Sequence, residues 1–270
     1  MRPEVAIAVP ELPSKLEWLN APFVRMNTLL GRGAVLVWFW DCCSLNALRA
    51  LPYLKEWDRR YSESGLRVLG IHSPQFEFGK ERQVVEESLR RLAVSFPVAL
   101  DSSFETWKLY GNEVWPALYL WDRRGMLRYY HFGEGAYEET ELAIQEALLE
   151  IDDELAFPPP MSPLRETDAP DALVQAPTPH VYLEEDRSRR AIDPGEELLI
   201  RYMGASAAAV LDGNGDIEIF LDGALLKSIQ LDGPRLYELV ESPGHEEHEL
   251  KLRFLGAGGA YAFSFAPGPA

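Results

Sequence analysis

The sequence predicts an α/β domain built on a mixed sheet, followed by an all-β sandwich. In the first part of the chain, continuous apolar runs alternate with segments whose apolar residues recur every three or four positions, as in buried strands and amphipathic helices. After residue 180, short alternating runs are separated by Gly and Asp turn signals about every 8–12 residues, which is typical of an antiparallel sandwich. Residues 156–179 carry seven Pro and little apolar periodicity, which indicates a linker. We therefore predict domains over 1–155 and 180–270.

The elements of the first domain follow in chain order. The run AVLVWFW over 34–40 has no polar position, so we expect a strand that is covered on both faces. The next segment, 44–61, has leucines and aromatic residues at helical spacing. Further patterns predict a strand over 66–72, a helix over 77–94, a strand over 96–101, a helix over 103–111, a hairpin over 116–133 and a terminal helix over 137–155. This order predicts a mixed central sheet flanked by helices.

The second domain is predicted as eight short strands. Each is an alternating or apolar run that ends at a turn signal. They lie over 180–186, 196–204, 207–213, 216–223, 224–232, 236–241, 248–256 and 260–267.

Charge and hydropathy exclude several classes of partner. The formal net charge of −17 repels a phosphate backbone, so we expect no nucleic-acid partner. No apolar run approaches the roughly 18 residues of a membrane span, so we expect no membrane partner. The first twenty residues lack the apolar core of a signal peptide. We therefore expect a cytoplasmic protein, although a mature exported fragment with a new Met would look the same.

Five stretches of the first domain carry a resemblance to a known family. They read EWLNAP (17–22), GRGAVLVWFWDCCSLNALRALPYL (31–54), GIHSPQFEF (70–78), FPVALDSSFETWKLYGNEVWPALYLWD (96–122) and HFGEGAYEETE (131–141). Together they resemble the thioredoxin-like domains of the TlpA/ResA, or redoxin, type, in the subgroup found in DipZ-like and NHL-repeat-containing proteins. The tail HELKLRFLGAGGAYAFSFAPG (248–268) resembles the end of the sandwich in DipZ-like proteins. The resemblance implies a thioredoxin-like fold and thiol–disulfide or peroxide chemistry.

The same resemblance sets the register of the cysteine motif. Aligning FW and LRALP puts Ser44 at the first cysteine of C-x-x-C and Ala47 at the second, and Pro52 fits where such proteins kink the helix. Cys43 then directly precedes the motif, and Cys42 precedes Cys43. The family's exchange reaction needs a thiolate at the helix start and a second thiol one turn on. A Ser hydroxyl and an Ala methyl supply neither, so we expect no ordinary dithiol exchange.

Three interpretations of Cys42 and Cys43 stay open at this point. Both can be buried remnants, because Cys packs as a small hydrophobe. Alternatively, Cys43 is an exposed thiolate at the helix start that acts as a thiol or peroxide sensor, with Cys42 resolving it as a strained vicinal disulfide. In the third interpretation, Ser44 and Ala47 are engineered substitutions that silence the site.

The resemblance also points to a substrate groove. Trp115–Pro116 lies where the family keeps a cis-proline beside the active site, and Trp40 and Asp41 flank the motif. We expect these four residues to line the groove. Asp41 is expected to raise the pKa of a neighbouring thiol by like-charge repulsion. His72 is the nearest candidate base along the chain, although a lone His is more often structural.

The sequence-based interpretation is a thioredoxin-like binding or scaffold protein. Its groove would accept a protein thiol or peptide segment, and its sandwich, similar in layout to carbohydrate-binding modules, would bind an unspecified ligand. The alternative is a residual thiol or peroxide oxidoreductase, or redox sensor, using Cys43 with Cys42. We expect no cofactor and no metal: DGNGD at 212–216 lacks the later residues of a calcium loop, and HEEH at 245–248 is not the zinc-binding H-E-x-x-H.

Overall fold

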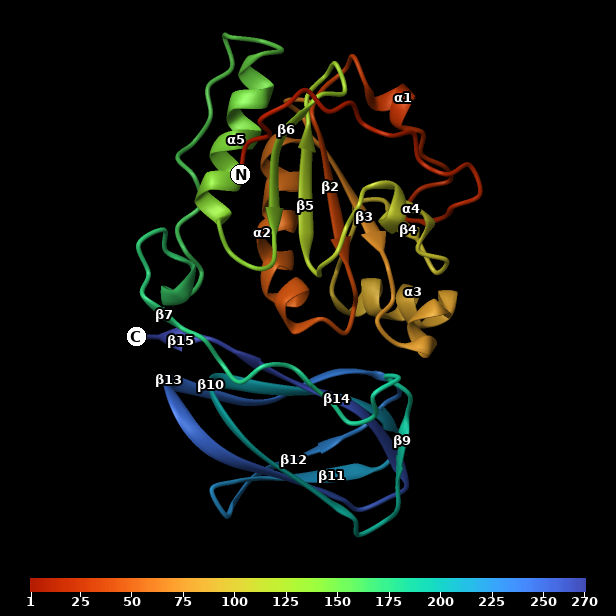
Figure 1. Cartoon of the computed structure of the whole chain (residues 1–270), viewed down its shortest axis with the longest axis vertical. Coiled ribbons are helices and arrows are strands. Elements are labelled where there is room, and N and C mark those ends of the chain that lie inside the picture. The colour runs from red at the N-terminus through yellow and green to blue at the C-terminus, as the bar shows by residue number, and fades with distance from the viewer. The chain divides into compact units, whose positions relative to one another are not determined.

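The structure, a computed structural model, describes all 270 residues. The chain divides into two compact units (Figure 1). The first contains residues 1–75 and 79–170, and the second contains residues 76–78 and 171–270. Each unit is described by itself.

A six-stranded mixed sheet forms the centre of the first unit, as predicted. Its strand order is β1-β4-β3-β2-β5-β6. Strands β2, β3 and β4 pair in parallel, whereas β1, β5 and β6 pair antiparallel to their neighbours. The strands are β1 (Glu17–Leu19), β2 (Val35–Trp40), β3 (Arg67–His72), β4 (Val98–Leu100), β5 (Ala117–Trp121) and β6 (Leu127–Phe132).

Helices surround this sheet. They are α1 (Met26–Leu29), α2 (Leu45–Tyr61), α3 (Arg82–Arg91), α4 (Glu105–Leu109) and α5 (Tyr137–Leu149), with a 3-10 turn η1 at Glu77–Lys80. Helices α2 and α5 lie together beside the sheet in Figure 1. No helix of the chain is long and apolar enough to cross a bilayer.

Strand β2 is buried along its whole length, which explains its unbroken apolar run. Val35, Val37 and Phe39 point into a core completed by side chains of α1 and α4. The alternate residues point to the opposite face, where Trp38 stacks on Trp40 at a ring separation of 4.8 Å. Both faces of this strand are therefore covered, and β2 holds the centre of the sheet.

The N-terminal segment covers the edge strand β6. The Met1 carbonyl accepts from the Tyr130 amide, and the Ile7 carbonyl accepts from the Leu127 amide. Ala8 adds a bridge to Met126. An open strand edge is a template for pairing with other chains, so this cover protects the sheet.

A buried carboxylate joins α2, α5 and part of the Pro-rich segment. Glu141 on α5 is 1% exposed and accepts from Trp57 Nε1 at 3.0 Å and from the Tyr61 hydroxyl at 2.6 Å. It also accepts from Arg60 at 3.1 Å and from the backbone N–H of Met161 at 2.9 Å. Four donors satisfy both oxygens, as a buried charge requires.

A second polar cluster holds residues 164–168 on the same unit. The Tyr53 hydroxyl donates to Asp168 at 2.7 Å and accepts from the Leu164 amide at 2.8 Å. Nearby, Arg49 donates to Glu134 at 2.6 Å. Burial raises the pKa of Glu134, and the Arg49 charge opposes that rise. Residues 156–170, which the composition alone assigns to a linker, are thus anchored within the first unit.

The second unit is all β. A seven-stranded antiparallel sheet runs β12-β11-β13-β10-β14-β8, β9 pairs with β14, and β7 with β15 forms a small second sheet. The strands are β7 (Val174–Gln175), β8 (Val181–Tyr182), β9 (Arg190–Ile192), β10 (Glu197–Gly213), β11 (Asp216–Leu221), β12 (Ala224–Gln230), β13 (Arg235–Phe254), β14 (Gly258–Ala266) and β15 (Gly268–Pro269).

Two long strands replace four of the predicted short ones. Strand β10 merges the runs predicted over 196–204 and 207–213, and β13 merges those over 236–241 and 248–256. The pairing of β10 with β13 shifts register between Gly204 and Ser206, opposite β13 residues 242–245. Pro243 and Gly244 lie in this stretch and would predict a turn. They instead form part of a bulge, which lets the strand bend and continue. The two halves of each strand enclose one apolar core.

Glu141→Ala should lower the free energy of unfolding of the first unit by about 3 kcal/mol, because it leaves the Trp57 and Tyr61 donors and Arg60 without their acceptor. All seven Trp lie in this unit, so urea unfolding followed by Trp fluorescence reports on it. Glu138→Ala, at an exposed position of the same helix, is the matched control, with an expected loss below about 1 kcal/mol. Equal losses in the two variants would contradict the anchoring role of Glu141.

Candidate functional site

The candidate site lies where β2 ends and α2 begins. Ser44 is the N-cap of α2, with extended backbone dihedrals, and its Oγ accepts from the Ala47 amide at 3.4 Å. Ala47 is fully buried one turn into the helix. The unpaired amides of the first turn favour a polar or negatively charged atom at this point. The Ser44 hydroxyl occupies that position.

Asp41 shapes the tight loop between β2 and α2. Its Oδ1 accepts from the Cys43 amide at 2.8 Å, and its backbone carbonyl accepts from the Ser44 amide at 3.0 Å. Its Oδ2 accepts from the Gln75 amide at 3.2 Å, which ties this loop to the one after β3. The side chain of Asp41 thus orders the backbone that carries both cysteines.

Cys42 and His72 meet beside Asp41. Strands β2 and β3 pair in parallel with Trp40 opposite His72, so the residues that follow Trp40 lie at the same sheet edge as the imidazole. The donor atoms of Asp41, Cys42 and His72 all lie within 4.8 Å of one another, and each residue is about 1% exposed. The Asp41 Oδ2 to His72 Nε2 distance is 3.4 Å.

The ionisation of Cys42 and of His72 depends on their charged neighbours. A hydrogen bond from Cys43 lowers the pKa of the Cys42 thiol well below its usual range, with help from His72 and against burial and the Asp41 charge. Burial lowers the pKa of His72, but the Cys42 thiolate and Asp41 outweigh it and hold that pKa above its usual range.

The backbone beside the site contains the cis peptide bond Trp115–Pro116. The Trp115 indole donates to the Ser73 carbonyl at 2.8 Å, and its ring lies 4.2 Å from that of Trp107. The Pro116 carbonyl accepts from the Gly133 amide at 2.8 Å. These contacts hold the segment next to the loop after β3.

Comparisons with known proteins agree with this topology. The chain is 36% identical to Protein DipZ of Mycobacterium bovis over 177 residues, which are 64% of this chain and 25% of that protein. It is 26% identical over 144 residues to the thiol-disulfide oxidoreductase YkuV of Bacillus subtilis, covering 53% of this chain and 96% of YkuV. The solution structure of a thioredoxin-like protein in the oxidized form matches 54% of this chain and 98% of its own, with TM-score 0.50 and 25% identity.

The first unit is a thioredoxin-like domain of the redoxin, TlpA type. NHL repeat-containing protein 2 of Homo sapiens is also similar, with 31% identity over 148 residues, which are 54% of this chain and 20% of that protein. No protein-family model matches the chain. The chain spans about a quarter of the length of the DipZ proteins that it matches.

Several expectations about the thioredoxin-like domain need correction. Cys43 is 2% exposed, which contradicts the interpretation of it as an exposed thiolate at the helix start, one of the three left open by the sequence. Both cysteines are thiols, without a vicinal disulfide. Trp40 and Asp41, expected to line a groove, are at most 1% exposed and present no surface to a ligand. Pro116 is also buried, and Trp115 alone of the expected groove residues is partly exposed.

The pairing of Cys42 with His72 was missed by sequence reasoning. Thirty positions separate the two residues along the chain, and no spacing motif connects them. The available signal was the parallel pairing of the two predicted strands, because the carboxyl ends of neighbouring parallel strands meet at one edge. Applied to 34–40 and 66–72, that rule puts His72 beside the cysteines.

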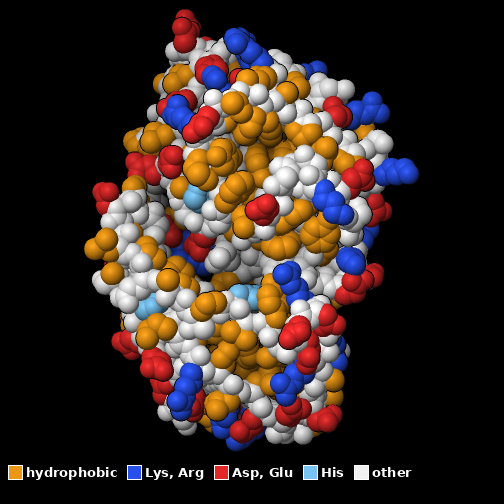
Figure 2. Space-filling view, in the orientation of Figure 1, with side chains coloured by type: hydrophobic (Ala, Val, Ile, Leu, Met, Phe, Trp, Pro, Cys, Tyr) orange, Lys and Arg blue, Asp and Glu red, His pale blue; other side chains and the backbone are white.

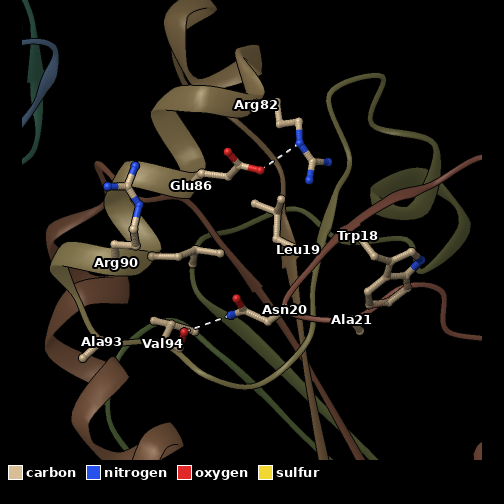
Figure 3. A pocket seen from close by; sticks show the side chains of 10 residues that line it. Trp18, Leu19, Asn20, Ala21, Arg82, Glu86, Arg90, Ala93 and Val94 are labelled. Carbon is tan, nitrogen blue, oxygen red and sulfur yellow. Dashed lines mark hydrogen bonds and ion pairs between the residues drawn. The ribbon is translucent and has the colours of Figure 1, made fainter.

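A separate pocket of about 450 Å³ lies between β1 and α3 (Figure 3). Its most prominent charge, Arg82, is paired with Glu86 at 2.9 Å. Asn20 closes one end by donating to the Val94 carbonyl at 2.9 Å. The pocket shares no residue with the Asp41–Cys42–His72 cluster.

Ser44→Ala should lower the free energy of unfolding by about 0.5–2 kcal/mol, because the Ala47 amide loses its capping acceptor. Urea unfolding by Trp fluorescence measures the change. Asn46→Ala, exposed in the same first turn, is the control and should be neutral or slightly stabilising, because Ala has the higher helix propensity. A Ser44→Ala protein as stable as the wild type would show that the hydroxyl does not cap the helix.

Proposed function

We propose that the chain is a thioredoxin-like binding protein that does not perform ordinary dithiol exchange. The observation that carries this proposal is the identity of the residues at the start of α2. Ser44 supplies a hydroxyl that caps α2, and Ala47 supplies a buried methyl one turn further on. A hydroxyl forms no disulfide, and its pKa is far above that of a thiol, so the two-sulfur reaction has neither its nucleophile nor its resolving group.

The proposed binding surface surrounds the cis-proline. Val114, which is 38% exposed, precedes the partly exposed Trp115, and Phe132, which is 43% exposed, ends the neighbouring strand β6. Phe132 lies here because β6 pairs with β5 in the register that puts it opposite Ala117, the residue after Pro116. Figure 2 shows hydrophobic side chains gathered over the first unit on the face in view. Such a surface suits an extended apolar segment of a protein partner.

A second candidate function is residual thiol redox chemistry. It is favoured by one contact, the hydrogen bond between the thiols of Cys43 and Cys42. In this reaction Cys42 attacks a peroxide oxygen and becomes a sulfenic acid as the O–O bond breaks and water leaves. The Cys43 thiol then attacks the sulfenic sulfur, and a second water leaves as the disulfide forms, so one peroxide is reduced as two thiols are oxidised.

A ligand of the second unit stays a prediction, because a fold alone specifies no ligand chemistry.

Insulin reduction by dithiothreitol separates the two candidates. The wild type should not accelerate it, whereas Ser44→Cys/Ala47→Cys should, because this double variant restores a thiol at the helix start and another one turn on. Its control is Asn46→Cys/Leu142→Cys, which adds two thiols without that geometry. Wild-type turnover of insulin or peroxide that Cys42→Ser abolishes would overturn the binding proposal in favour of the redox one.

Binding at the cis-proline surface is testable with an unfolded probe, the alkylated and fluorophore-labelled insulin B chain. Val114→Asp should weaken its binding about 10-fold, since a carboxylate desolvated against an apolar segment costs more than about 1.4 kcal/mol. Leu142→Asp, at an exposed apolar position on α5, is the matched control and should leave the anisotropy curve unchanged. Equal affinities for wild type and Val114→Asp would exclude this surface.

A further inference from the structure

Three side chains with different donor atoms converge at the carboxyl ends of β2 and β3. Asp41 offers a carboxylate oxygen, Cys42 a sulfur and His72 an imidazole nitrogen. All three donor atoms lie within 4.8 Å of one another, and the residues are about 1% exposed. Asp41 and Cys42 follow the last residue of β2 directly, and His72 is the last residue of β3, so the ends of two paired strands place the cluster.

Asp41 and Cys42 act on the imidazole of His72 through their charges, but no hydrogen bond of good geometry reaches its ring nitrogens. Neither ring nitrogen has a hydrogen-bond partner, although the residue is 1% exposed. The Asp41 Oδ2 lies 3.4 Å from Nε2, which is longer than the usual hydrogen-bond range of about 2.7–3.2 Å. A buried polar group without a partner costs free energy, so a ligand that engages a ring nitrogen would stabilise this arrangement.

The same distance fits two ligands of one metal ion. Zn–N and Zn–O bonds of about 2.0–2.2 Å at a tetrahedral angle place the two donor atoms about 3.4 Å apart. That is the separation of Asp41 Oδ2 and His72 Nε2. A sulfur and a nitrogen on the same ion would lie about 3.6 Å apart, within the 4.8 Å limit of the cluster.

We propose that Asp41, Cys42 and His72 bind one Zn²⁺ ion. Thiolate, imidazole and carboxylate are the donors that this borderline-soft ion takes in proteins. The thiolate and carboxylate together balance the charge of the ion inside the protein. Three protein ligands leave the fourth tetrahedral position to water or a small exogenous ligand. This site differs from the no-metal expectation of the sequence analysis, which weighed only contiguous motifs.

The surrounding structure already orients one ligand. The Cys43 amide holds Oδ1 of Asp41 at 2.8 Å, and the Gln75 amide contacts Oδ2 at 3.2 Å. Hydrogen bonds to a ligating carboxylate fix its direction and contribute to metal affinity. The proposal is independent of the binding surface at Val114 and Phe132, and it engages the sulfur of Cys42 rather than the motif position of Ser44.

Cobalt and zinc titrations of the full chain test the site. Wild type should bind one Co²⁺ with a sulfur-to-metal charge-transfer band in the near ultraviolet and tetrahedral d–d bands, and one Zn²⁺ should displace both. His72→Gln and Cys42→Ser should weaken Zn²⁺ binding about 100-fold or more in competition with a chromophoric chelator, since loss of an outer-shell contact alone costs roughly 10–100-fold. Cys42→Ser should also remove the charge-transfer band.

Two controls separate a metal site from a folding defect. His131→Gln changes a histidine on β6 outside the cluster and should retain the band and the affinity. Zn²⁺ should raise the melting temperature of wild type and His131→Gln, but not of His72→Gln. The proposal is overturned if wild type binds no Zn²⁺ in stoichiometric amount, if His72→Gln binds as tightly as wild type, or if Cys43→Ser rather than Cys42→Ser removes the charge-transfer band.

Discussion

The parallel pairing of β2 with β3 determines where this domain can perform chemistry. Trp40 lies opposite His72, so the two strands end at the same level and deliver their next residues to one edge. Gly70 makes this packing feasible, because a Cβ there would lie 3.1 Å from the Trp40 indole nitrogen and 3.0 Å from Val98. The cysteines, the helix start and the imidazole all depend on that register.

Two nearby positions at this edge, Ser44 and Cys42, have separate surroundings. Ser44 is the N-cap of α2, and its oxygen accepts a hydrogen bond from the Ala47 amide. The remaining sulfur chemistry lies just before the helix, in a buried cluster with an acid and an imidazole. Burial and the short distances within the cluster thus make Cys42 a neighbour of Asp41 and His72.

The Pro-rich segment shows how polar contacts can order a stretch that composition assigns to a linker. Proline content and weak periodicity argue against regular structure, and residues 156–170 contain only one 3-10 turn, Glu166–Asp168. Their backbone and side chains nevertheless reach Glu141 and Tyr53, which lie on α5 and α2. No local pattern predicts these contacts, because the residues that meet are far apart in the sequence.

The amino-acid pattern by itself determined the mixed sheet, the order of helices α2 to α5 and the all-β second unit, but not the short elements β1 and α1. Those features follow from local periodicity and from turn and cap residues, which act over a few positions. Only the tertiary structure decided that Cys43 is buried, that Trp40 and Asp41 line no groove, and that Cys42 meets His72. It also decided that β10 and β13 continue through apparent turns. These outcomes depend on which strands pair and in which register, and residues far apart in the chain set that pairing together.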